Sequence, residues 1–201
     1  MPRAVIVDYG IGNLFSLRCA LDKVGFDSVI RTSPLQQKDA DLVVLPGVGS
    51  FPAASRNLSS LRDEILTQVR DGMPLLGICL GMQLLFCKSE EGEGRGLELL
   101  QGKNERLPGS VKVPQMGWNT LEILRPSRIL ENIEDGSYMY FVHSYHSVPL
   151  DNDVIVAETT YGTAFPSAVE KQNVYGTQFH PEKSGQSGLK ILSNLFEITR
   201  R

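Results

Sequence analysis

Cys79 has a glycine two positions before it and another two positions after it, a spacing that could make its sulfur a nucleophile. Residues 74–78 predict a short buried strand, and Leu80, Leu84 and Leu85 predict the first turns of a helix. A glycine-flanked nucleophile at such a junction is a nucleophile elbow, whose sharp turn has room for little more than hydrogen. The sulfur would face a helix N-terminus, where backbone N–H groups favour the thiolate.

The alternative for Cys79 is a structural role, since free cysteine is often a small buried apolar residue. The flanking glycines argue against that alternative, because glycine weakens a buried strand. Cys19 and Cys87 lack such glycines, and we expect both to be structural. The chain has 3 cysteines without repeated spacing, which argues against a disulfide framework and fits a reducing compartment.

A cysteine nucleophile needs a base, and His180 is the best placed of the 3 histidines. A predicted strand ends just before His180, so its imidazole would lie at the end of that strand. Glu182 follows two residues later, and in an extended segment its carboxylate can lie beside the imidazole and fix its tautomer. An isolated His-x-Glu is more often an exposed pair, but together with the elbow it favours a Cys–His–Glu triad.

His143 and His146 raise the alternative of a metal site, which their spacing does not support. They are three residues apart in a predicted strand, which would place them on opposite faces. No Cys-x-x-Cys or His-x-x-x-His pair occurs in the sequence. We therefore expect no metal ion and no other cofactor.

Two glycine turns follow predicted strands. Gly10-Ile11-Gly12-Asn13 lacks the third glycine of a dinucleotide-binding fingerprint, so it supports nucleotide binding only weakly. Pro46-Gly47-Val48-Gly49 permits a peptide flip and a close backbone approach, so its N–H groups could face an oxyanion beside the elbow. A plain glycine turn is the alternative for the second segment, and the spacing alone does not separate the two.

The elements that would position these residues alternate along the first half of the chain. The predicted order is strand 4–8, helix 14–24, strand 28–31, strand 42–45, helix 58–69, strand 74–78 and a helix from residue 80. This alternation predicts an α/β fold with a mostly parallel central sheet flanked by helices on both faces. Both the glycine loop 46–49 and Cys79 would lie at the carboxyl ends of strands, where such sheets bind ligands.

The second half of the chain predicts a more antiparallel part. Short β-rich segments occur at 97–100, 120–124, 138–148, 154–160, 167–170 and 174–179, with a hairpin connection at 171–173 and a closing helix from residue 189. No repeat, low-complexity tract or linker divides the chain, so we expect a single domain over residues 1–201.

Composition limits the class of function. Of the 201 residues, 41% are hydrophobic and 21% charged, which is typical of a globular protein with a real core. A net charge of −3 and scattered Lys and Arg residues argue against nucleic acid and anionic membranes as partners. No apolar run approaches the roughly 20 residues that span a bilayer, and we see no signal peptide. We expect a cytoplasmic protein.

These motifs together resemble those of the class I, or triad-type, glutamine amidotransferases. The matching segments are Pro46-Gly47-Val48-Gly49, Gly77-Ile78-Cys79-Leu80-Gly81-Met82-Gln83 and Gln178-Phe179-His180-Pro181-Glu182, in the order that the family has them. Within the family, the chain resembles the glutaminase subunits of imidazole glycerol phosphate synthases, which serve histidine biosynthesis. The segments that carry this narrower resemblance are 8–14, 46–51, 116–119, 140–145 and 180–184.

The resemblance implies a mechanism and a set of site residues. Cys79 would attack the side-chain amide of glutamine to give a glutamyl thioester and ammonia, with His180 as acid and then base, oriented by Glu182. The implied oxyanion donors are backbone N–H groups of Leu80 and of the loop Gly47, Val48 and Gly49. The residues implied to hold glutamine are Gln83, Glu91, Gly49, Ser144 and Tyr145, with Glu91 nearest the α-ammonium and Ser144 and Tyr145 at the α-carboxylate.

The resemblance also implies a partner that takes up the ammonia. This partner is a cyclase subunit with a (β/α)₈-barrel fold, which forms a heterodimer with the glutaminase and makes imidazole glycerol phosphate and aminoimidazole carboxamide ribotide. The residues expected to face it are Asn13, Met116-Gly117-Trp118-Asn119, Tyr140 and Lys183. A buried core position is the alternative for Trp118.

Two other classes of function stay open at this point. One is an amidotransferase subunit for another acceptor, or a stand-alone γ-glutamyl hydrolase. The other is a non-catalytic α/β module that binds a partner or a small ligand. Covalent labelling of Cys79 by a glutamine-like electrophile would separate an enzyme from a binding module.

Overall fold

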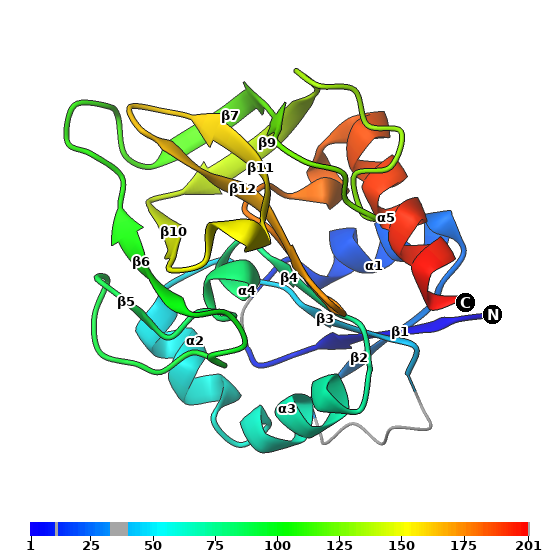
Figure 1. The fold of residues 1–201 in the computed structure, drawn as a ribbon. Coiled ribbons are helices and arrows are strands. Elements are labelled where there is room, and N and C mark those ends of the chain that lie inside the picture. Colours follow the sequence, from blue (N-terminus) through cyan, green and yellow to red (C-terminus); the bar gives the residue numbers. More distant parts are fainter. Residues whose placement is uncertain (11, 33–39, 201) are drawn as a thin grey trace.

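An eight-stranded sheet forms the centre of the protein in the computed structural model, which describes residues 1–10, 12–32 and 40–200 (Figure 1). Its strand order is β2-β1-β3-β4-β13-β12-β11-β8. Parallel strands form one half of the sheet: β1 (Arg3–Val7), β2 (Asp27–Arg31), β3 (Leu42–Leu45) and β4 (Leu75–Ile78). The other half contains β8 (Glu122–Ile123), β11 (Ile155–Thr160), β12 (Ala164–Lys171) and β13 (Val174–Thr177).

Strand β13 joins the two halves of the sheet. It pairs in parallel with β4, whereas the pairs β13–β12, β12–β11 and β11–β8 are antiparallel. The predicted α/β fold, with a mostly parallel sheet and a more antiparallel C-terminal part, is therefore confirmed. The other described strands form two smaller sheets. One contains β5 (Lys88–Ser89), β6 (Gly102–Arg106) and β10 (Tyr145–Pro149), and the other contains β7 (Gln115–Thr120) and β9 (Tyr138–His143).

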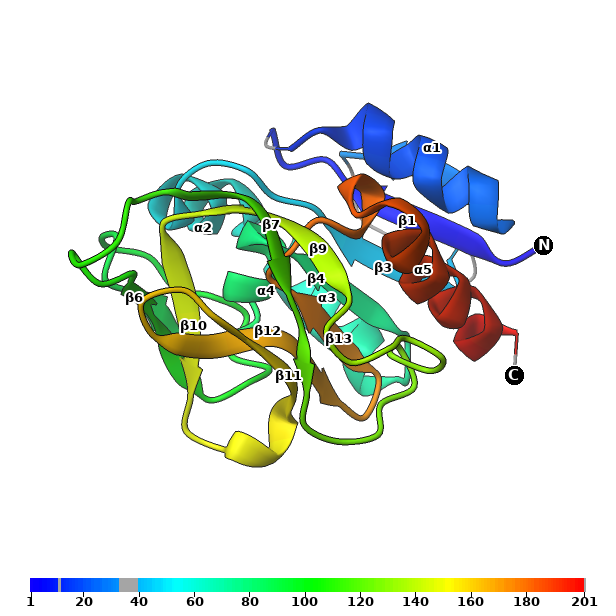
Figure 2. The same ribbon diagram turned by 90° about the horizontal axis from the view of Figure 1, so that it is seen from above.

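Helices cover both faces of the central sheet, as predicted. Figures 1 and 2 show α1 (Leu14–Val24) and α5 (Gly185–Thr199) on one face, and α2 (Phe51–Leu58) and α3 (Arg62–Arg70) on the other. The other helices among residues 1–10, 12–32 and 40–200 are short: α4 (Leu80–Gln83), η2 (Asn152–Val154) and η3 (Pro181–Lys183). None of the helices in the described part of the chain is long and apolar enough to cross a membrane.

Alternate residues of the central strands pack under the two helix layers. In β3, Val43 and Leu45 belong to the core that contains the buried residues of α2 and α3. Leu42 and Val44 belong to the core on the opposite face, with the buried residues of α1 and α5. Each fully buried side chain of this size contributes roughly 1.5–3 kcal/mol to the free energy of folding, so the two cores fix β3 firmly.

Helix α1 begins and ends where the sequence predicts. Asn13 is its N-cap, and the Asn13 side chain accepts a hydrogen bond from the backbone N–H of Ser16 at 3.2 Å. Gly25 is the C-cap with a φ of 112°, a left-handed conformation that glycine adopts without strain. Ile11, in the glycine turn before this helix, lies outside the described residues.

The helix predicted over 58–69 forms as α3, but it begins only at Arg62, and a separate helix, α2, precedes it and ends at Leu58. Helix α2 begins at Phe51, with Pro52 in its first turn. Phe51 and Ala54 are buried and lie at helical spacing, so the sequence does carry a signal for α2 that the prediction missed.

The strand predicted at 97–100 does not form. Leu97 and Leu100 are both buried although they lie three residues apart, and Glu98 between them has a φ of 58°, outside the extended region. The N–H of Leu97 donates to the carbonyl oxygen of Leu84 at 2.7 Å instead of joining a ladder. The apolar residues therefore indicated burial correctly but not the backbone conformation.

The strand predicted over 138–148 is two strands, β9 and β10, which belong to different sheets. The chain leaves one sheet after His143 and enters the next at Tyr145, with Ser144 between them. Residues 142–145, at this break, line the pocket described below.

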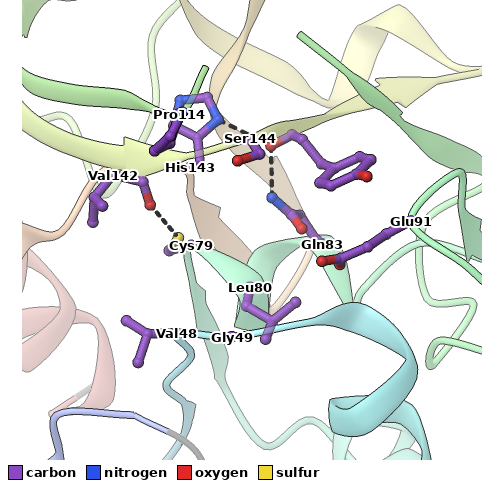
Figure 3. Close-up of a pocket in the computed structure, with 11 residues that line it drawn as sticks. Val48, Gly49, Cys79, Leu80, Gln83, Glu91, Pro114, Val142, His143 and Ser144 are labelled. Carbon is purple, nitrogen blue, oxygen red and sulfur yellow. Dashed lines mark hydrogen bonds between the residues drawn. The ribbon is translucent and has the colours of Figure 1, made fainter. Parts of the chain in front are cut away.

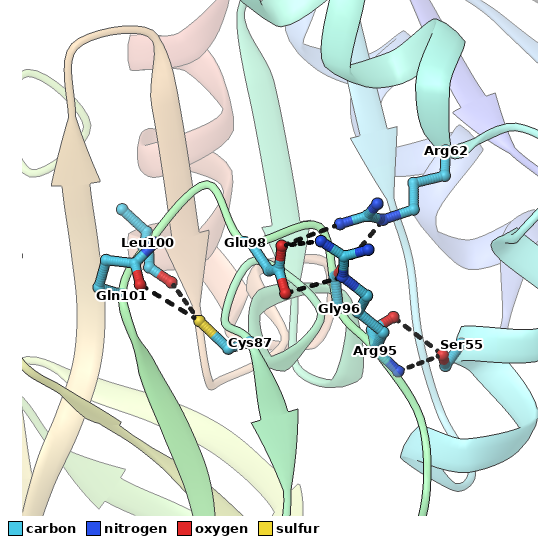
Figure 4. Close-up of polar contacts among 8 residues, drawn as sticks. All are labelled: Ser55, Arg62, Cys87, Arg95, Gly96, Glu98, Leu100 and Gln101. Carbon is cyan, nitrogen blue, oxygen red and sulfur yellow. Dashed lines mark hydrogen bonds and ion pairs between the residues drawn. The ribbon is translucent and has the colours of Figure 1, made fainter.

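An ion-pair network holds the loop after β5 against α2 and α3 (Figure 4). Glu98 accepts hydrogen bonds from Arg95, at 2.8 and 2.6 Å, and from Arg62 of α3, at 3.3 Å. Arg95 thereby holds the pKa of Glu98 below its ordinary value. The Ser55 hydroxyl of α2 bonds both the N–H and the carbonyl oxygen of Arg95 at 2.8 Å. This loop is therefore docked on the helix layer at several points.

Candidate active site

Cys79 lies at the turn between β4 and α4, in a strained backbone conformation. Its φ is 54° and its ψ is −108°, a combination that costs on the order of 1–3 kcal/mol in a residue with a side chain. The strand-to-helix turn predicted at this position is confirmed. Cys79 is only 4% exposed, and its sulfur lies 3.5 Å from the carbonyl oxygen of Val142 in β9.

The glycines around Cys79 allow backbone to touch backbone. A Cβ on Gly77 would lie 2.5 Å from the carbonyl oxygen of Gly81, and a Cβ on Gly81 would lie 1.9 Å from that of Leu45. A Cβ on Gly47 would lie 2.6 Å from the Leu80 Cβ. The loop after β3 therefore rests directly on the elbow, a close approach of the kind that its glycines permit.

His180 and Glu182 come to the elbow from the other half of the chain. Strand β13 lies beside β4 in parallel, and the N–H of Cys79 donates to the carbonyl oxygen of Thr177 at 2.7 Å. This register carries His180 to the same edge of the sheet. His180 Nδ1 lies 2.8 Å from Glu182 Oε1, and the side chains are 3% and 5% exposed. The Ser184 hydroxyl donates to the His180 carbonyl oxygen at 2.7 Å and fixes the backbone.

The electrostatics of the pair favour a charged imidazole. Burial alone would lower the pKa of His180, but the nearby Cys79 and Glu182 outweigh it and raise that pKa well above its ordinary value of 6.5. The His180 Nε2 atom is buried and has no hydrogen-bond partner among the described residues. That nitrogen is available to hold or release a proton beside the sulfur.

A pocket of about 200 Å³ opens in front of Cys79 (Figure 3). Figure 3 shows the loop residues Val48 and Gly49 on one side of it, and His143 and Ser144 on the other. The lining residues are Val48, Gly49, Cys79, Leu80, Gln83, Glu91, Pro114, Val142, His143, Ser144 and Tyr145. Of the residues predicted to bind substrate, only Gly47 does not line the pocket, because it packs beneath the loop on Leu80.

Two polar side chains of the lining are fixed by backbone groups. Gln83 Nε2 donates to the carbonyl oxygen of Tyr145 at 2.7 Å, which ties α4 to the start of β10. Glu91 Oε2 accepts from the N–H of Phe51 at 2.6 Å, at the first turn of α2. The Glu91 carboxylate therefore both faces the pocket and holds the far end of the glycine loop.

Tyr9, which sequence reasoning did not single out, anchors the near end of the loop. Its buried hydroxyl donates to the carbonyl oxygen of Pro46. Burial raises the pKa of Tyr9, and the proximity of Cys79 raises it further, so the hydroxyl stays protonated as a donor. Only its position in the sequence indicated such a role: Tyr9 comes just after β1, at the same carboxyl edge of the sheet as the loop after β3.

The prediction that His143 and His146 lie on opposite faces is wrong. Both rings lie near Phe165, at centroid distances of 5.1 and 5.7 Å, because the strand breaks at Ser144 between them. His143 lines the pocket, and burial lowers its pKa to about 4, so it is neutral at pH 7. Among the described residues, no group of three or more His, Cys, Asp or Glu side chains could hold a metal ion.

Two aromatic residues, Trp118 of β7 and the half-buried Tyr140 of β9, lie outside the core. Trp118 is 57% exposed, so the alternative of a buried core position for it is wrong. The Trp118 ring meets Tyr140 edge to face at 5.9 Å, and Lys183 Nζ lies 5.8 Å from the Tyr140 ring centroid. Met116 is exposed as well, and Asn13 is exposed where it caps α1.

The other two cysteines stand apart from this site. Cys19 is exposed on α1. Cys87 is partly buried, and its sulfur lies 3.8 Å from the carbonyl oxygen of Leu100. Neither lines the pocket.

Comparison with known proteins matches nearly the whole chain to one family. The family model described as glutamine amidotransferase class-I matches residues 5–198. A protein named imidazole glycerol phosphate synthase subunit HisH from Methanothermobacter thermautotrophicus is 49% identical over 196 residues, covering 97% of this chain and 98% of that protein. A protein of the same name from Aquifex aeolicus is 48% identical over 196 residues, covering 96% and 95%.

Solved structures share the fold at low sequence identity. The structure of PurLQS from Thermotoga maritima has a TM-score of 0.77 at 24% identity and covers 98% of each chain. A crystal structure described as a glutamine amidotransferase has a TM-score of 0.75 at 19% identity, covering 98% of this chain and 99% of that one. These likenesses show the fold.

The close contact between elbow and loop can be tested with one methyl group. We expect Gly81→Ala to lower the free energy of unfolding by more than about 3 kcal/mol, because the new Cβ would force β3 away from the elbow. Urea unfolding measures this loss. Gly109→Ala is the matched control, since a Cβ there meets nothing within 4 Å. Parent-like stability of Gly81→Ala would contradict the packing described above.

Proposed function

The chain belongs to the class-I glutamine amidotransferase family, and we propose that it is the glutaminase subunit of an imidazole glycerol phosphate synthase. In this role it hydrolyses glutamine to glutamate and ammonia, and a second subunit uses the ammonia in histidine biosynthesis. One observation carries the chemistry: a strained cysteine faces a pocket, with a buried histidine–carboxylate pair next to it.

The first half of the reaction forms a thioester. The Cys79 thiolate attacks the side-chain carbonyl carbon of glutamine, so that a C–S bond forms and the carbonyl electron pair moves onto oxygen. His180 gives its Nε2 proton to the amide nitrogen, the C–N bond breaks and ammonia leaves. The raised pKa of His180 supports this step, because the imidazole then carries the proton at neutral pH.

The second half returns the enzyme to its starting state. His180 takes a proton from a water molecule as the water oxygen attacks the thioester carbon. The C–S bond breaks, glutamate leaves and Cys79 is a thiolate again. Glu182 holds the imidazole through Nδ1 during both halves, which keeps Nε2 aimed at the reacting atoms.

The pocket supplies the groups that hold the substrate. In this proposal the N–H groups of Leu80 and of the loop Gly47–Gly49 stabilise the oxyanion, a role supported by the packing of Gly47 on Leu80. Gln83, Ser144 and Tyr145 hold glutamine from the other side of the pocket. Glu91 is placed to pair with the α-ammonium, because it is a carboxylate that lines the pocket.

The ammonia must reach its acceptor without loss, and the surface beside the pocket supports a docked partner. We place a cyclase subunit with a (β/α)₈-barrel fold on the surface formed by Asn13, Met116–Asn119, Tyr140 and Lys183, as a heterodimer. Strand β9 carries Tyr140 on this surface and Val142 in the pocket lining. A partner seated on β7 and β9 would therefore cover the entrance of the pocket.

Replacement of the nucleophile tests the chemistry. We expect Cys79→Ala to lower glutaminase turnover in the complex by at least about 10³-fold while partner binding persists. Labelling of the parent with diazo-oxo-norleucine, followed by peptide mass analysis, should place the adduct on Cys79 and not on exposed Cys19. Retained turnover in Cys79→Ala would refute the mechanism, and an unlabelled Cys79 would favour a binding module.

Glu182→Gln tests the pair behind the nucleophile. Because the carboxylate favours the imidazolium, its removal should lower the pKa of His180 by about one unit or more. Titration of the histidine ring resonances by NMR measures this shift. His146 is the internal control, because burial lowers its pKa and its charged neighbours are Glu90 and Glu105, so its titration should not move. An unchanged pKa for His180 would contradict the role of Glu182.

Trp118→Ala tests the docking surface. A central exposed tryptophan at an interface typically contributes enough that the Kd for the cyclase subunit should rise at least about tenfold. Calorimetric titration with the cyclase subunit measures the Kd. Leu150→Ala, at an 81% exposed residue beyond β10, is the control that should leave the Kd unchanged. If both variants bound like the parent, the partner would have to dock elsewhere.

A further inference from the structure

Gln178 is a fully buried amide that lies between the nucleophile and the glutamine-binding pocket. It is 0% exposed and follows directly after β13. Its Nε2 lies 3.7 Å from the Cys79 sulfur, and its Oε1 lies 3.2 Å from Gln83 Nε2. Its backbone N–H donates to the carbonyl oxygen of Ser167 at 2.9 Å, so the residue is fixed at both backbone and side chain.

The hydrogen bonds around Gln178 determine which end of its amide faces the sulfur. The carbonyl oxygen of Tyr145 can only accept, so the Gln83 atom 2.7 Å from it must be the nitrogen. That nitrogen also points at Gln178, so the Gln178 atom at 3.2 Å must be the oxygen. The remaining Gln178 atom, the NH₂ group, therefore faces Cys79.

We propose that Gln178 is a hydrogen-bond donor to the nucleophile, which stabilises the Cys79 thiolate and aims it at the substrate carbonyl. The inference deepens the proposed function and rests on it, because the proposed reaction begins with attack by a Cys79 thiolate. Gln83 orients the donor through the Gln178 oxygen, so one chain of amides links the substrate pocket to the sulfur.

The surroundings of the sulfur explain why such a donor is needed. Cys79 is 4% exposed, so water can supply few hydrogen bonds to its sulfur. The Val142 carbonyl oxygen can accept from the thiol but gives nothing to the thiolate. The other groups that face Cys79 are His180, the counter-ion, with Glu182 behind it, and the buried neutral Tyr9. Gln178 adds a neutral donor that stays in place when the proton has left.

The test measures ionisation of Cys79 directly and needs no glutamine. The full chain is alkylated with iodoacetamide across a range of pH, and the rate at each cysteine is followed by peptide mass analysis. The thiolate is the reacting form, so the midpoint of the rate profile reports ionisation of Cys79. Exposed Cys19 serves as an internal control in every sample. Glutamine turnover, measured separately, tests the proposed function itself.

Two variants separate the donor from the rest of the amide. Gln178→Glu keeps an oxygen for Gln83 to bond but presents a second oxygen to the sulfur in place of NH₂. Gln178→Met keeps the length of the side chain and removes both hydrogen bonds. We expect the Cys79 midpoint to rise by about one pH unit in Gln178→Met and by more in Gln178→Glu, with the Cys19 midpoint unchanged.

A purely structural role for the buried amide predicts a different result. Asn194→Leu removes another buried amide, which lies within α5 and donates to the carbonyl oxygens of Ile129 and Glu131. This control should lower the free energy of unfolding without moving the Cys79 midpoint. Should both Gln178 variants lose stability yet keep the parent midpoint, the inference is overturned. A folded Gln178→Glu with the parent midpoint would be sufficient on its own to overturn it.

Discussion

The structure depends on one close backbone contact, in which the elbow after β4 lies directly on the carboxyl end of β3. A hydrogen at Gly81 is all that fits against the Leu45 carbonyl oxygen. The contact brings the loop after β3 under Cys79, and it holds this residue in a conformation that costs on the order of 1–3 kcal/mol. Two cores, one on each face of β3, supply far more than this through their buried side chains.

A second constraint, the parallel register of β13 with β4, determines what surrounds the sulfur. Because Thr177 lies opposite Ile78, the residues that follow each strand emerge side by side at one edge. Gln178 and His180 thus reach Cys79 although about a hundred residues separate them in the sequence. Strand β13, through its parallel pairing with β4, therefore brings His180 to the edge of the sheet where Cys79 lies.

The sequence predicted the parts of this site that depend on local pattern. Glycine spacing around Cys79, the strand at 42–45 and the alternation of strands and helices are local signals, and the structure agrees with them. The strand predicted over 174–179 ends two residues earlier, at Thr177. Tyr9 carried no such signal, because its role comes from a hydrogen bond to a residue on another strand. The break at Ser144 was missed for a related reason. Residues 138–148 form one β-rich segment in the sequence, and only the pairing with other strands places β9 and β10 in different sheets.

The glycine loop over the elbow is held at both ends, which limits how it can move. The Tyr9 hydroxyl bonds the Pro46 carbonyl oxygen at one end, and the Glu91 carboxylate bonds the Phe51 N–H at the other. Glu91 is itself carried by a loop that the Glu98 network docks on α2 and α3. Peptide rotation that keeps both anchors is therefore confined to the residues between them. Val48, at the centre, is 40% exposed. A rearrangement at Val48 would therefore leave both anchors and the core below in place.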